Sequence, residues 1–540
     1  MSIKKLKIKN FKRFSGWFTI EFNEGTNILV GNNGEGKSTI LEAINLVLTG
    51  TYRGKNIKNE ISPYLFNKSV LNEYVQGMKS NIKIELPEIV IECYFNEEYP
   101  GLLGDGNSER SRDISGISLT IRFDQKYANE YALLSPNEIN SIPIEYYEVR
   151  WQSFARENIT LRSLPEKSAL IDSTSYTPIS GSDIYISRII KNILEENEIV
   201  KIAQVHRIMK ENFSKESVVM GINQKLEDIA NEKVTISVDL GNKNSWESFL
   251  ITELDDIPYN FIGKGKQSVI KTKLALSDEK IADKKIILLE EPECHLSHSN
   301  LNILLNTVNN SKQDKQIIIT THSSFVANKL GLEHLILINE SKTLRLADLQ
   351  IQTQNYFKKV SGYDTLRFLF SKKSILVEGP SDELIVQRAY MDFHGGKLPI
   401  QQGVDVISVG TSFLRFLEIA QLLQLNVSVV TDNDGNIEVL ERKYSKYLEV
   451  NKKENINICY DQTVHNYNGK INEYNYNTIE PCILRSNSLD KMNRILNKTF
   501  SSEDELLQFM KNNKTEVALK IFESEEQIVY PDYIREAISL

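Results

Sequence analysis

Residues 31–38 of this chain read GNNGEGKS, which fits the phosphate-binding pattern G-x-x-x-x-G-K-S in full. An apolar run precedes the motif and a helical pattern follows it, which is the context that the motif requires. Its glycines let backbone N–H groups close around a β-phosphate, and the N-terminus of the helix adds partial positive charge. We expect Lys37 to reach the β- and γ-phosphates and the Ser38 hydroxyl to ligate Mg²⁺. The run therefore predicts a site for ATP with Mg²⁺.

Two later strand-like runs end in side chains suited to the same site. The run IILLEE ends in Glu290 and Glu291, of which the first is suited to hold Mg²⁺ and the second to polarise the water that attacks the γ-phosphate. The run IIITTH ends in His322, which is placed to contact the γ-phosphate. A lone histidine is more often structural, but its position one strand after the paired glutamates favours a functional role.

A second set of residues is acidic. Glu378 follows the apolar run SILV, and Asp382 falls in the first turn of the next expected helix, with Ser381 as its N-cap. Asp432 and Asp434 follow the run VSVV, where positions i and i+2 of a strand share a face. Two like charges 4 Å apart repel by roughly 4 kcal/mol at an effective dielectric of ~20, so such a cluster is suited to hard divalent cations. It predicts a site for Mg²⁺, Mn²⁺ or Ca²⁺.

The elements that must position these residues alternate between strands and helices, and two apolar strands that end in carboxylates are where α/β folds place ligands. Residues 451–477, rich in Asn, Tyr and Lys, are read as a polar insertion, although their interleaved Tyr and Lys could also stack on and neutralise a nucleic-acid strand. Residues 104–113 are read as a loop. Strands are expected at 3–8, 17–22, 27–31, 89–95, 116–123, 234–240, 286–290, 317–321, 335–338, 374–377, 404–409 and 427–430, and helical segments at 40–47, 184–229, 299–308 and 414–423.

Composition limits the class of protein. A length of 540 residues suggests two to four domains. The net charge of −8 excludes a polycation that coats nucleic acid, although it leaves room for a local basic groove. No run approaches the ~18 apolar residues that span a bilayer, the N-terminus has no apolar core like that of a signal peptide, and the 4 cysteines form no CxxC pair. We expect a cytoplasmic protein without a membrane partner.

The segments IKNFKRF and GNNGEGKSTILEAI resemble the head domains of ATP-binding-cassette proteins that act on DNA, the SMC, RecF and Rad50 group. The resemblance implies that EEPECHLS is the Walker B strand with its D-loop, and that FIGKGKQ at 261–267 is the signature loop, although it lacks the serine of the signature. The spacing from Ser38 to Gly263 is too short for the long coiled coil of SMC or Rad50. The nucleotide contacts so implied are Asn32, Gly34, Gly36, Lys37, Ser38, Thr39, Gly263, Gly265, Gln267, Glu290 and His322.

The acidic set resembles the Toprim domain of topoisomerases, bacterial primases and certain nucleases. A cassette head followed by a Toprim domain is the architecture of the OLD (overcoming lysogenization defect) family of ATP-linked endonucleases. That resemblance implies Glu480, in NTIEPCI, as a further acidic ligand and Lys514, in KNNKTEV, as a catalytic lysine. The catalytic residues so implied are Glu378, Asp382, Asp432, Asp434, Glu480, Lys514 and Glu291, and the metal ligands are Ser38, Glu290, Glu378, Asp382, Asp432, Asp434 and Glu480.

The resemblance implies an α/β fold, in which an ABC-type ATPase head carries an inserted helical dimerisation segment and is followed by a Toprim domain with a Rossmann-like sheet. We expect the first part of the head, with Walker A, at 1–180 and the helical insert at 181–235. The second part of the head, with the signature, Walker B and the switch histidine, is expected at 236–370, and the Toprim nuclease domain at 371–540.

The sequence therefore predicts an ATP-regulated, metal-dependent DNA endonuclease of the kind found in anti-phage defence. The expected partners are DNA, further copies of the chain in a homodimer or larger homo-oligomer, and a defence partner such as a retron reverse transcriptase with its RNA/DNA, or a helicase. Two alternatives stay open. One is a non-catalytic ATP-gated DNA clamp of the RecF type, although RecF has no Toprim domain. The other is a Toprim primase or topoisomerase, against which stand the missing zinc-ribbon pattern and the missing context for a nucleophilic tyrosine.

Overall fold

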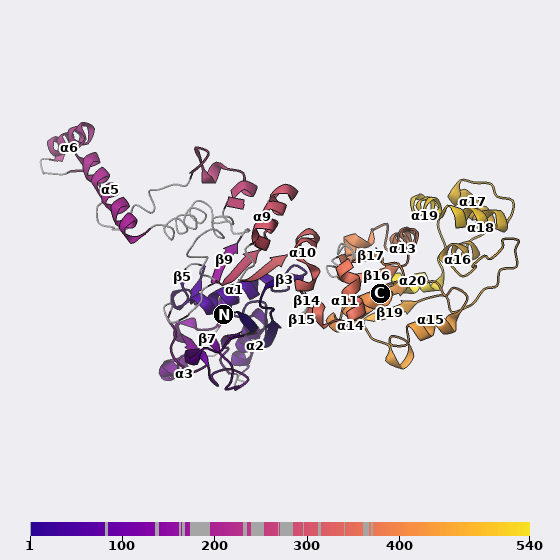
Figure 1. Ribbon diagram of the computed structural model, residues 1–540, viewed down its shortest axis with the longest axis horizontal. Helices are drawn as coiled ribbons and strands as arrows, with labels where there is room; N and C mark the ends of the chain where they lie inside the picture. Colours follow the sequence, from indigo (N-terminus) through magenta and orange to yellow (C-terminus); the bar gives the residue numbers. More distant parts are fainter. Residues whose placement is uncertain are drawn as a thin grey trace. The chain divides into compact units, whose positions relative to one another are not determined.

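The computed structural model shows a mixed α/β protein (Figure 1), which confirms the expected fold class. Close packing divides the chain into two compact units, one of Met1–Ile28 and Ser38–Thr321 and the other of Leu29–Lys37 and His322–Leu540. The structure describes residues 2–53, 55–80, 85–134, 140–160, 164, 168–172, 195–230, 235–238, 253–267, 269–270, 285–294, 296–310, 315–339, 341–359, 367–368 and 371–539.

An antiparallel sheet of five strands in the order β2-β1-β6-β7-β8 forms one layer of the first unit. Its strands alternate between buried apolar and more exposed polar side chains, as strands with one face on a core do. On β7, for example, Ile117, Leu119 and Ile121 are buried, whereas Ser118 and Thr120 face the other way. The strands are β1 (Ile3–Lys9), β2 (Trp17–Glu21), β6 (Ile89–Phe95), β7 (Gly116–Phe123) and β8 (Tyr147–Ser153), and the helices nearby in sequence are α2 (Lys68–Lys79) and α3 (Ala128–Ala132).

A parallel set of strands in the same unit ends in the residues expected at an ATP site. Strand β12 lies between β13 and β9 and is parallel to both. Their residues form nearly continuous apolar runs, which is the pattern of strands covered on both faces. The elements are β9 (Ser168–Asp172), β12 (Ile286–Glu290), β13 (Gln316–Thr321) and α9 (His298–Asn310), together with β3 (Thr26–Gly31), whose last residues belong to the second unit, and α1 (Lys37–Thr49).

Two helices follow in the segment expected to be helical, α5 (Glu196–Ser214) and α6 (Ser217–Ala230). They contact each other, and α5 begins with Glu195 and Glu198 in a capping box. The helical expectation is therefore confirmed for the described part of 184–229, while 184–194 and residues 234, 239 and 240 of the expected 234–240 strand lie outside the described residues. Residues 235–238 are not a strand, so the expectation there is wrong. Short pairs complete the unit: β4 (Thr51–Tyr52) with β5 (Lys55–Asn56), and β10 (Glu253–Leu254) with β11 (Ile257–Pro258).

The second unit is built around a parallel sheet of four strands in the order β17-β16-β18-β19. Helix α13 packs on β16 and β17, α20 packs on β18 and β19, and the two helices contact each other. Its elements are α10 (Ser324–Leu330), β14 (Leu335–Asn339), β15 (Lys342–Arg345), α11 (Ile351–Lys359), β16 (Lys373–Val377), α13 (Pro380–Phe393), β17 (Val404–Ser408), α14 (Phe413–Leu423), β18 (Asn426–Val430), α15 (Ile437–Lys443), β19 (Ile456–Cys459), α16 (Ile479–Ser486), α17 (Leu489–Leu496), α18 (Glu503–Asn512), α19 (Lys514–Glu523) and α20 (Asp532–Ile538).

The polar stretch 451–477 is not wholly an insertion between strands, because its residues Ile456–Cys459 form β19, the edge strand of this sheet. Its apolar residues Ile456 and Ile458 are buried against the sheet. The Asn- and Tyr-rich composition masked this short strand, and only the residues after it form the long connection that leads to α16.

Candidate functional site

The carboxyl edge of the four-stranded sheet carries the first two acids. Glu378 directly follows β16, and Asp432 comes two residues after the end of β18. The two strands are parallel neighbours in which Leu376 pairs with Val429, so both chains leave the sheet at the same edge. Among the described residues, no hydrogen bond or ion pair reaches either carboxylate. Both acids are therefore open to a ligand at the place where α/β sheets bind one.

Asp382 lies beside these two strand ends in the first turn of α13. Its Oδ2 accepts a hydrogen bond of 2.9 Å from the backbone N–H of Gly379. The helix begins at Pro380 with Gly379 as its N-cap, so the expected N-cap role of Ser381 is wrong. Proline favours the first helical position because its fixed φ suits the helix and its missing N–H is not needed there. That shift of the helix start places Asp382 at the third position, close to Glu378.

Asp434 is positioned by a turn and not by a strand. Strand β18 ends at Val430, and Asp434 has φ 49°, so the argument that positions i and i+2 share a strand face does not hold there. Its Oδ1 accepts a hydrogen bond of 2.7 Å from the Asn475 side chain, which comes from the polar connection before α16. Asn433 is buried and holds the turn through hydrogen bonds to the carbonyls of Asp461 and Thr463. The composition of 451–477 had indicated no role for Asn475 at this site.

Glu480 and Lys514 meet at this site from two different helices. Glu480, in the first turn of α16, is only 3% exposed, and its Oε2 accepts a hydrogen bond from the Thr478 hydroxyl at 3.1 Å. The Nζ of Lys514, the first residue of α19, lies 3.2 Å from Glu480 Oε1. That approach makes an ion pair, yet no hydrogen bond within the described residues reaches Oε1. The only contact that this buried carboxylate oxygen has among the described residues is thus the ion pair with Lys514.

The electrostatics of the site follow from crowding acids in a partly buried place. Burial raises the pKa of Asp382 to about 6, and the charges of Glu480 and Glu378 contribute. Burial and the same neighbours raise the pKa of Asp432 well above its usual range. Burial lowers the pKa of Lys514, but the negative charge of Glu480 and the other acids outweighs it and raises the pKa overall. The site resists holding all its negative charges without added positive charge.

The donor set fits a hard divalent cation, because every available donor is a carboxylate oxygen and one buried oxygen lacks a hydrogen bond. The part of the chain that the structure describes contains no group of three acid, histidine or cysteine side chains already arranged around one ion. Glu378 and Asp434 are exposed, and exposed side chains change rotamer within nanoseconds. The structure thus brings the expected acids into one electrostatic cluster, and their role as ligands stays a prediction.

The phosphate-binding run folds as a loop between β3 and α1. Gly34 and Gly36 have φ of 85° and 95°, a region that glycine enters without strain. A Cβ at Gly31 would lie 2.4 Å from the carbonyl oxygen of Ile338, so only glycine fits there. The buried Lys37 donates hydrogen bonds to the carbonyls of Gly31 and Asn32 at 2.9 and 2.8 Å, which holds its ammonium inside its own loop. Ser38 and Thr39 follow in the first turn of α1.

The paired glutamates lie at the end of β12 as expected. Glu290 pairs in register with Thr320 of the parallel strand β13, and His322 follows the last residue of β13. Glu291 has φ 40°, and its Oε2 accepts a hydrogen bond from the Cys294 thiol at 3.2 Å. The register thus brings the ends of β12 and β13 to one edge of the parallel strands.

The expected signature loop at 261–267 has a structural contact that its sequence did not show. The side-chain amide of Gln267 donates to the carbonyls of Tyr259 and Ile262 at 2.7 and 2.8 Å. Gln267 therefore holds the loop's own backbone. None of the described residues lies within 4 Å of a Cβ built on Gly263. The roles of Gly263, Gly265 and Gln267 in nucleotide binding stay predictions.

Two protein-family models match this chain. The model of an AAA ATPase domain matches residues 1–327, and the model of an Overcoming lysogenization defect protein-like TOPRIM domain matches residues 369–434. The second match includes Glu378, Asp382, Asp432 and Asp434 and ends before Glu480 and Lys514. No helix of the described residues is both long enough and apolar enough to cross a membrane.

The curated proteins that are similar to parts of this chain include proteins named for DNA replication and repair. The DNA replication and repair protein RecF of Lachnoclostridium phytofermentans is 23% identical over 343 residues, which is 57% of this chain and 90% of that protein. RecF of Lachnospira eligens is 23% identical over 63% of this chain and 98% of its own length. The DNA double-strand break repair Rad50 ATPase of Methanopyrus kandleri is 54% identical over 46 residues, 8% of this chain and 5% of that protein.

Among solved structures, the SMC head bound to the C-winged helix domain of ScpA shares 17% identity with a TM-score of 0.34, covering 64% of this chain and 98% of that one. The SMC head domain from Thermotoga maritima shares 13% identity with a TM-score of 0.31, covering 64% and 97%.

Proposed function

The chain belongs to the AAA ATPase family and carries an OLD-like TOPRIM domain after its ATPase domain, which is the architecture of the OLD family; from this we propose that it is a divalent-metal-dependent DNA endonuclease regulated by ATP. The observation that carries the proposal is the cluster of Glu378, Asp382, Asp432 and Glu480 at one edge of a parallel sheet, with Lys514 paired to Glu480. Such a cluster has a raised affinity for positive charge, and acids with strongly shifted pKa values gather at functional sites.

The residues of the cluster divide into two tasks. Glu378, Asp382, Asp432, Asp434 and Glu480 would hold Mg²⁺ or Mn²⁺. When bound, two such ions activate the attacking water and stabilise the leaving oxygen of a phosphodiester. Lys514, with about half of its side chain exposed, would offset the negative charge that develops on the phosphate. The ion pair with Glu480 keeps its ammonium aimed at the acids while the rest of the side chain stays accessible.

The ATPase half would bind ATP with Mg²⁺ and control access to DNA. The loop around Lys37 supports the proposal, because Gly34 and Gly36 have the positive φ values that let a loop of this motif curve its backbone around phosphates. Ser38, Glu290 and Glu291 supply the hydroxyl and carboxylates that such sites use for Mg²⁺ and for water. His322 follows the neighbouring strand and would contact the γ-phosphate.

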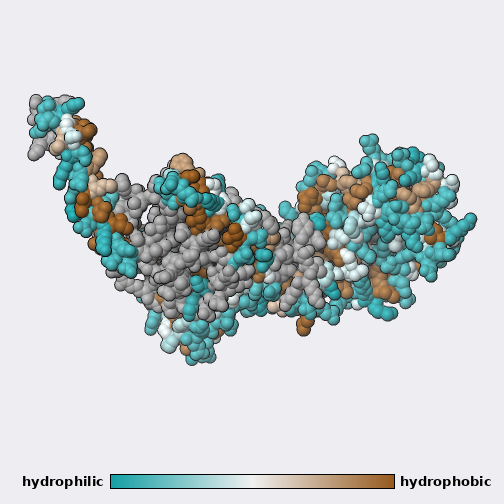
Figure 2. All heavy atoms as spheres, turned by 45° about the horizontal axis from the view of Figure 1, so that its top comes forward, coloured by the Kyte–Doolittle hydropathy of each residue, from teal (hydrophilic) through white to brown (hydrophobic). Residues whose placement is uncertain are grey.

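A homodimer is the assembly that the helices α5 and α6 support. Val205, Met209 and Phe213 recur every four residues on one face of α5 and are 67%, 43% and 58% exposed. Figure 2 shows hydrophobic side chains at the surface of this helical pair. Exposed apolar stripes of this kind are typical of interfaces between proteins. The predicted insert at 181–235 contains both helices, so we place the dimer contact there.

The role in anti-phage defence rests on the OLD-like architecture. Its test is plating efficiency: cells that carry the chain with its neighbouring genes should plate a susceptible phage less well than cells with the Asp432→Ala form. Equal plating for the two forms would contradict the defence role without touching the nuclease assignment.

The function itself is tested by cleavage of supercoiled plasmid with Mg²⁺ or Mn²⁺, with and without ATP. The parent should leave nicked or linear DNA, and folded Asp432→Ala should cut at least 100-fold more slowly because a displaced ion no longer aligns water and phosphate. Glu525→Gln is the matched control, since Glu525 is an exposed acid of the same unit without a partner in the described residues. Metal-independent DNA binding without breaks would favour a RecF-type clamp, and resealed products would favour a topoisomerase.

A further inference from the structure

The solvent face of the five-stranded sheet carries polar and basic side chains that the ATP and acid sites do not use. One row of paired residues runs across all its strands: Trp17, Lys9, Val90, Thr120 and Arg150. At ~4.8 Å between strands, the row spans about 19 Å, which is enough for several phosphates of a nucleic-acid strand. The face is thus broad and continuous, while the opposite face is buried in the core.

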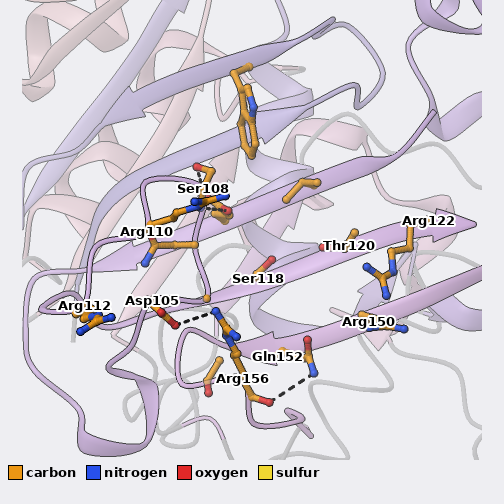
Figure 3. A pocket seen from close by; sticks show the side chains of 16 residues that line it. Asp105, Ser108, Arg110, Arg112, Ser118, Thr120, Arg122, Arg150, Gln152 and Arg156 are labelled. Carbon is orange, nitrogen blue, oxygen red and sulfur yellow. Dashed lines mark hydrogen bonds and ion pairs between the residues drawn. The ribbon is translucent and has the colours of Figure 1, made fainter. Parts of the chain in front are cut away.

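A cavity of about 870 Å³ lies over this face. Figure 3 shows arginines from three places pointing into it: two from the 104–113 loop, two from the neighbouring strands β7 and β8, and one from just beyond β8. Among the described residues that line it, the acids are Glu92 and Asp105. The arginine cavity, as we name it, is lined by Arg110, Arg112, Arg122, Arg150 and Arg156.

The 104–113 loop, which forms one wall of the arginine cavity, is held in place by hydrogen bonds to Glu92 of β6. The carboxylate of the buried Glu92 accepts hydrogen bonds from the backbone N–H and the hydroxyl of Ser108, both at 2.7 Å, and from the Tyr94 hydroxyl at 2.7 Å. Asn107 ties the loop to itself through its bonds to the carbonyls of Gly104 and Ser111. One of the two acids of the cavity is therefore committed to holding the wall and does not neutralise the arginines.

The arginines differ in how far they are already paired. Arg122 and Arg150 share one carboxylate, that of Glu148, at 3.2 and 2.5 Å from their Nε atoms, so the trio keeps positive charge in excess. Arg110 and Arg112 are exposed and form no ion pair within the part of the chain that the structure describes. A guanidinium binds phosphate with two parallel hydrogen bonds, so these arginines form a built receptor for phosphodiester groups.

Trp17 offers an aromatic ring on which a base can stack, a contact that inorganic anions and carboxylates cannot make. Its ring lines the cavity, is 44% exposed, and lies 4.8 and 5.8 Å from the ammonium groups of Lys7 and Lys9. Lys7 and Lys9 are themselves paired with Glu109 and Glu88, so the exposed ring would stack a base while the arginines of the cavity hold the phosphates. A base is free to stack only where it is unpaired.

We propose that the arginine cavity binds a nucleic-acid strand with unpaired bases, its phosphates on Arg110, Arg112, Arg122 and Arg150 and one base stacked on Trp17. It rests on the proposed function only for the class of ligand, because the cavity belongs to a different unit from the acidic cluster. The chain would thus hold a single-stranded segment, of DNA or RNA, on the unit that does not carry the acidic cluster.

The test is fluorescence anisotropy of the full chain in EDTA, so that nothing is cut, with labelled single-stranded DNA, single-stranded RNA and duplex DNA of one sequence. Arg110→Gln/Arg112→Gln should bind the single strands about tenfold more weakly, and the slope of log K against log salt should fall by about 1.4, at ~0.7 for each lost phosphate contact. Trp17→Ala should weaken single-strand binding about tenfold and leave duplex binding unchanged. The better of the two single strands identifies the sugar that the cavity prefers.

The matched control is Lys58→Gln/Lys68→Gln, which removes two exposed positive charges of the same unit away from the cavity. It should bind like the parent. Equal losses in the control and in the arginine variant, or equal competition by polyglutamate, would overturn the proposal, because only net charge would then matter. Plasmid cleavage by the parent is measured alongside. If the arginine and Trp17 variants bind like the parent while the parent cuts plasmid, the binding proposal is refuted and the nuclease proposal stands. If the variants bind more weakly but the parent does not cut, the nuclease proposal is refuted and the binding proposal stands.

Discussion

Replacing Asp382 by asparagine should make the metal-free protein more stable at neutral pH. The pKa of this carboxyl is raised from 3.8 to about 6 in the folded chain, so the folded state binds its proton more tightly than the unfolded state does. The free energy of unfolding must then fall as the pH rises from about 4 to about 6. Over that interval the loss amounts to roughly 3 kcal/mol, since each tenfold change in proton affinity is worth about 1.4 kcal/mol.

Asparagine keeps the shape of the side chain and can still accept the hydrogen bond from the Gly379 N–H, but it carries no charge to be repelled by Glu480 and Glu378. In EDTA at pH 7.5, the melting temperature of the second unit in Asp382→Asn should exceed that of the parent by several degrees, at ~2–4 °C per kcal/mol for a unit of this size. At pH 4 the parent and Asp382→Asn should have the same melting temperature.

Added Mn²⁺ should largely cancel the stability difference between the two proteins. The parent should gain up to about 2.7 kcal/mol at a metal concentration of 100 times its Kd, whereas the variant, with one ligand fewer, should gain less. Scanning calorimetry at pH 4, 6 and 7.5, with EDTA or Mn²⁺, measures both effects, and Glu525→Gln serves as the control that should follow the parent throughout. Parallel pH profiles for the parent and Asp382→Asn in EDTA would refute the reasoning, because burial and the neighbouring acids would then not disfavour the charged form of Asp382.

Three further outcomes follow from the described contacts. Lys37→Ala should lose ATP binding by at least 100-fold in titration calorimetry while the stabilisation by Mn²⁺ stays intact, and unchanged ATP affinity would contradict the phosphate-loop assignment. Lys514→Met should slow plasmid cleavage at least tenfold, and cleavage at the parental rate would rule out a catalytic role for Lys514. The variant should also melt at a slightly lower temperature at pH 7.5, because a lysine whose pKa is raised in the folded state stabilises the fold at every pH below its pKa in the unfolded state. Val205→Glu/Phe213→Glu should halve the mass found by light scattering, and a monomeric parent would remove the dimer proposal.

Patterns contained in one short stretch of chain predicted the structure well. The apolar runs of β12 and β13 and the glycine loop before Lys37 are set by neighbours in sequence, so hydrophobic pattern and turn chemistry suffice to place them. The start of α13 was missed by two residues because Ser381 is a good N-cap in isolation, while Pro380 at the first helical position decides the actual boundary.

Features made by contacts between distant segments could not be predicted in the same way. The strand β19 has four residues inside a polar stretch, and it forms only because β18 offers a free edge that buries Ile456 and Ile458. The hydrogen-bond partner of Asp434 is Asn475, 41 positions away, and no sequence pattern links the two residues. Resemblance to a known family supplied Glu480 and Lys514, for which spacing alone gave no signal.

The arginine cavity shows why net charge is a poor guide to a binding surface. The chain carries −8 overall, and no segment of it is an arginine run. On β7 and β8 the polar residues simply alternate with apolar ones, as they do on any half-buried strand. The antiparallel register sets Thr120 opposite Arg150 and Arg122 opposite Glu148, and the bonds of Glu92 to Ser108 then hold a loop with two more arginines above that row. A basic surface therefore arises from pairing across strands, and its charge is concentrated where the backbone places it, whatever the average over the chain.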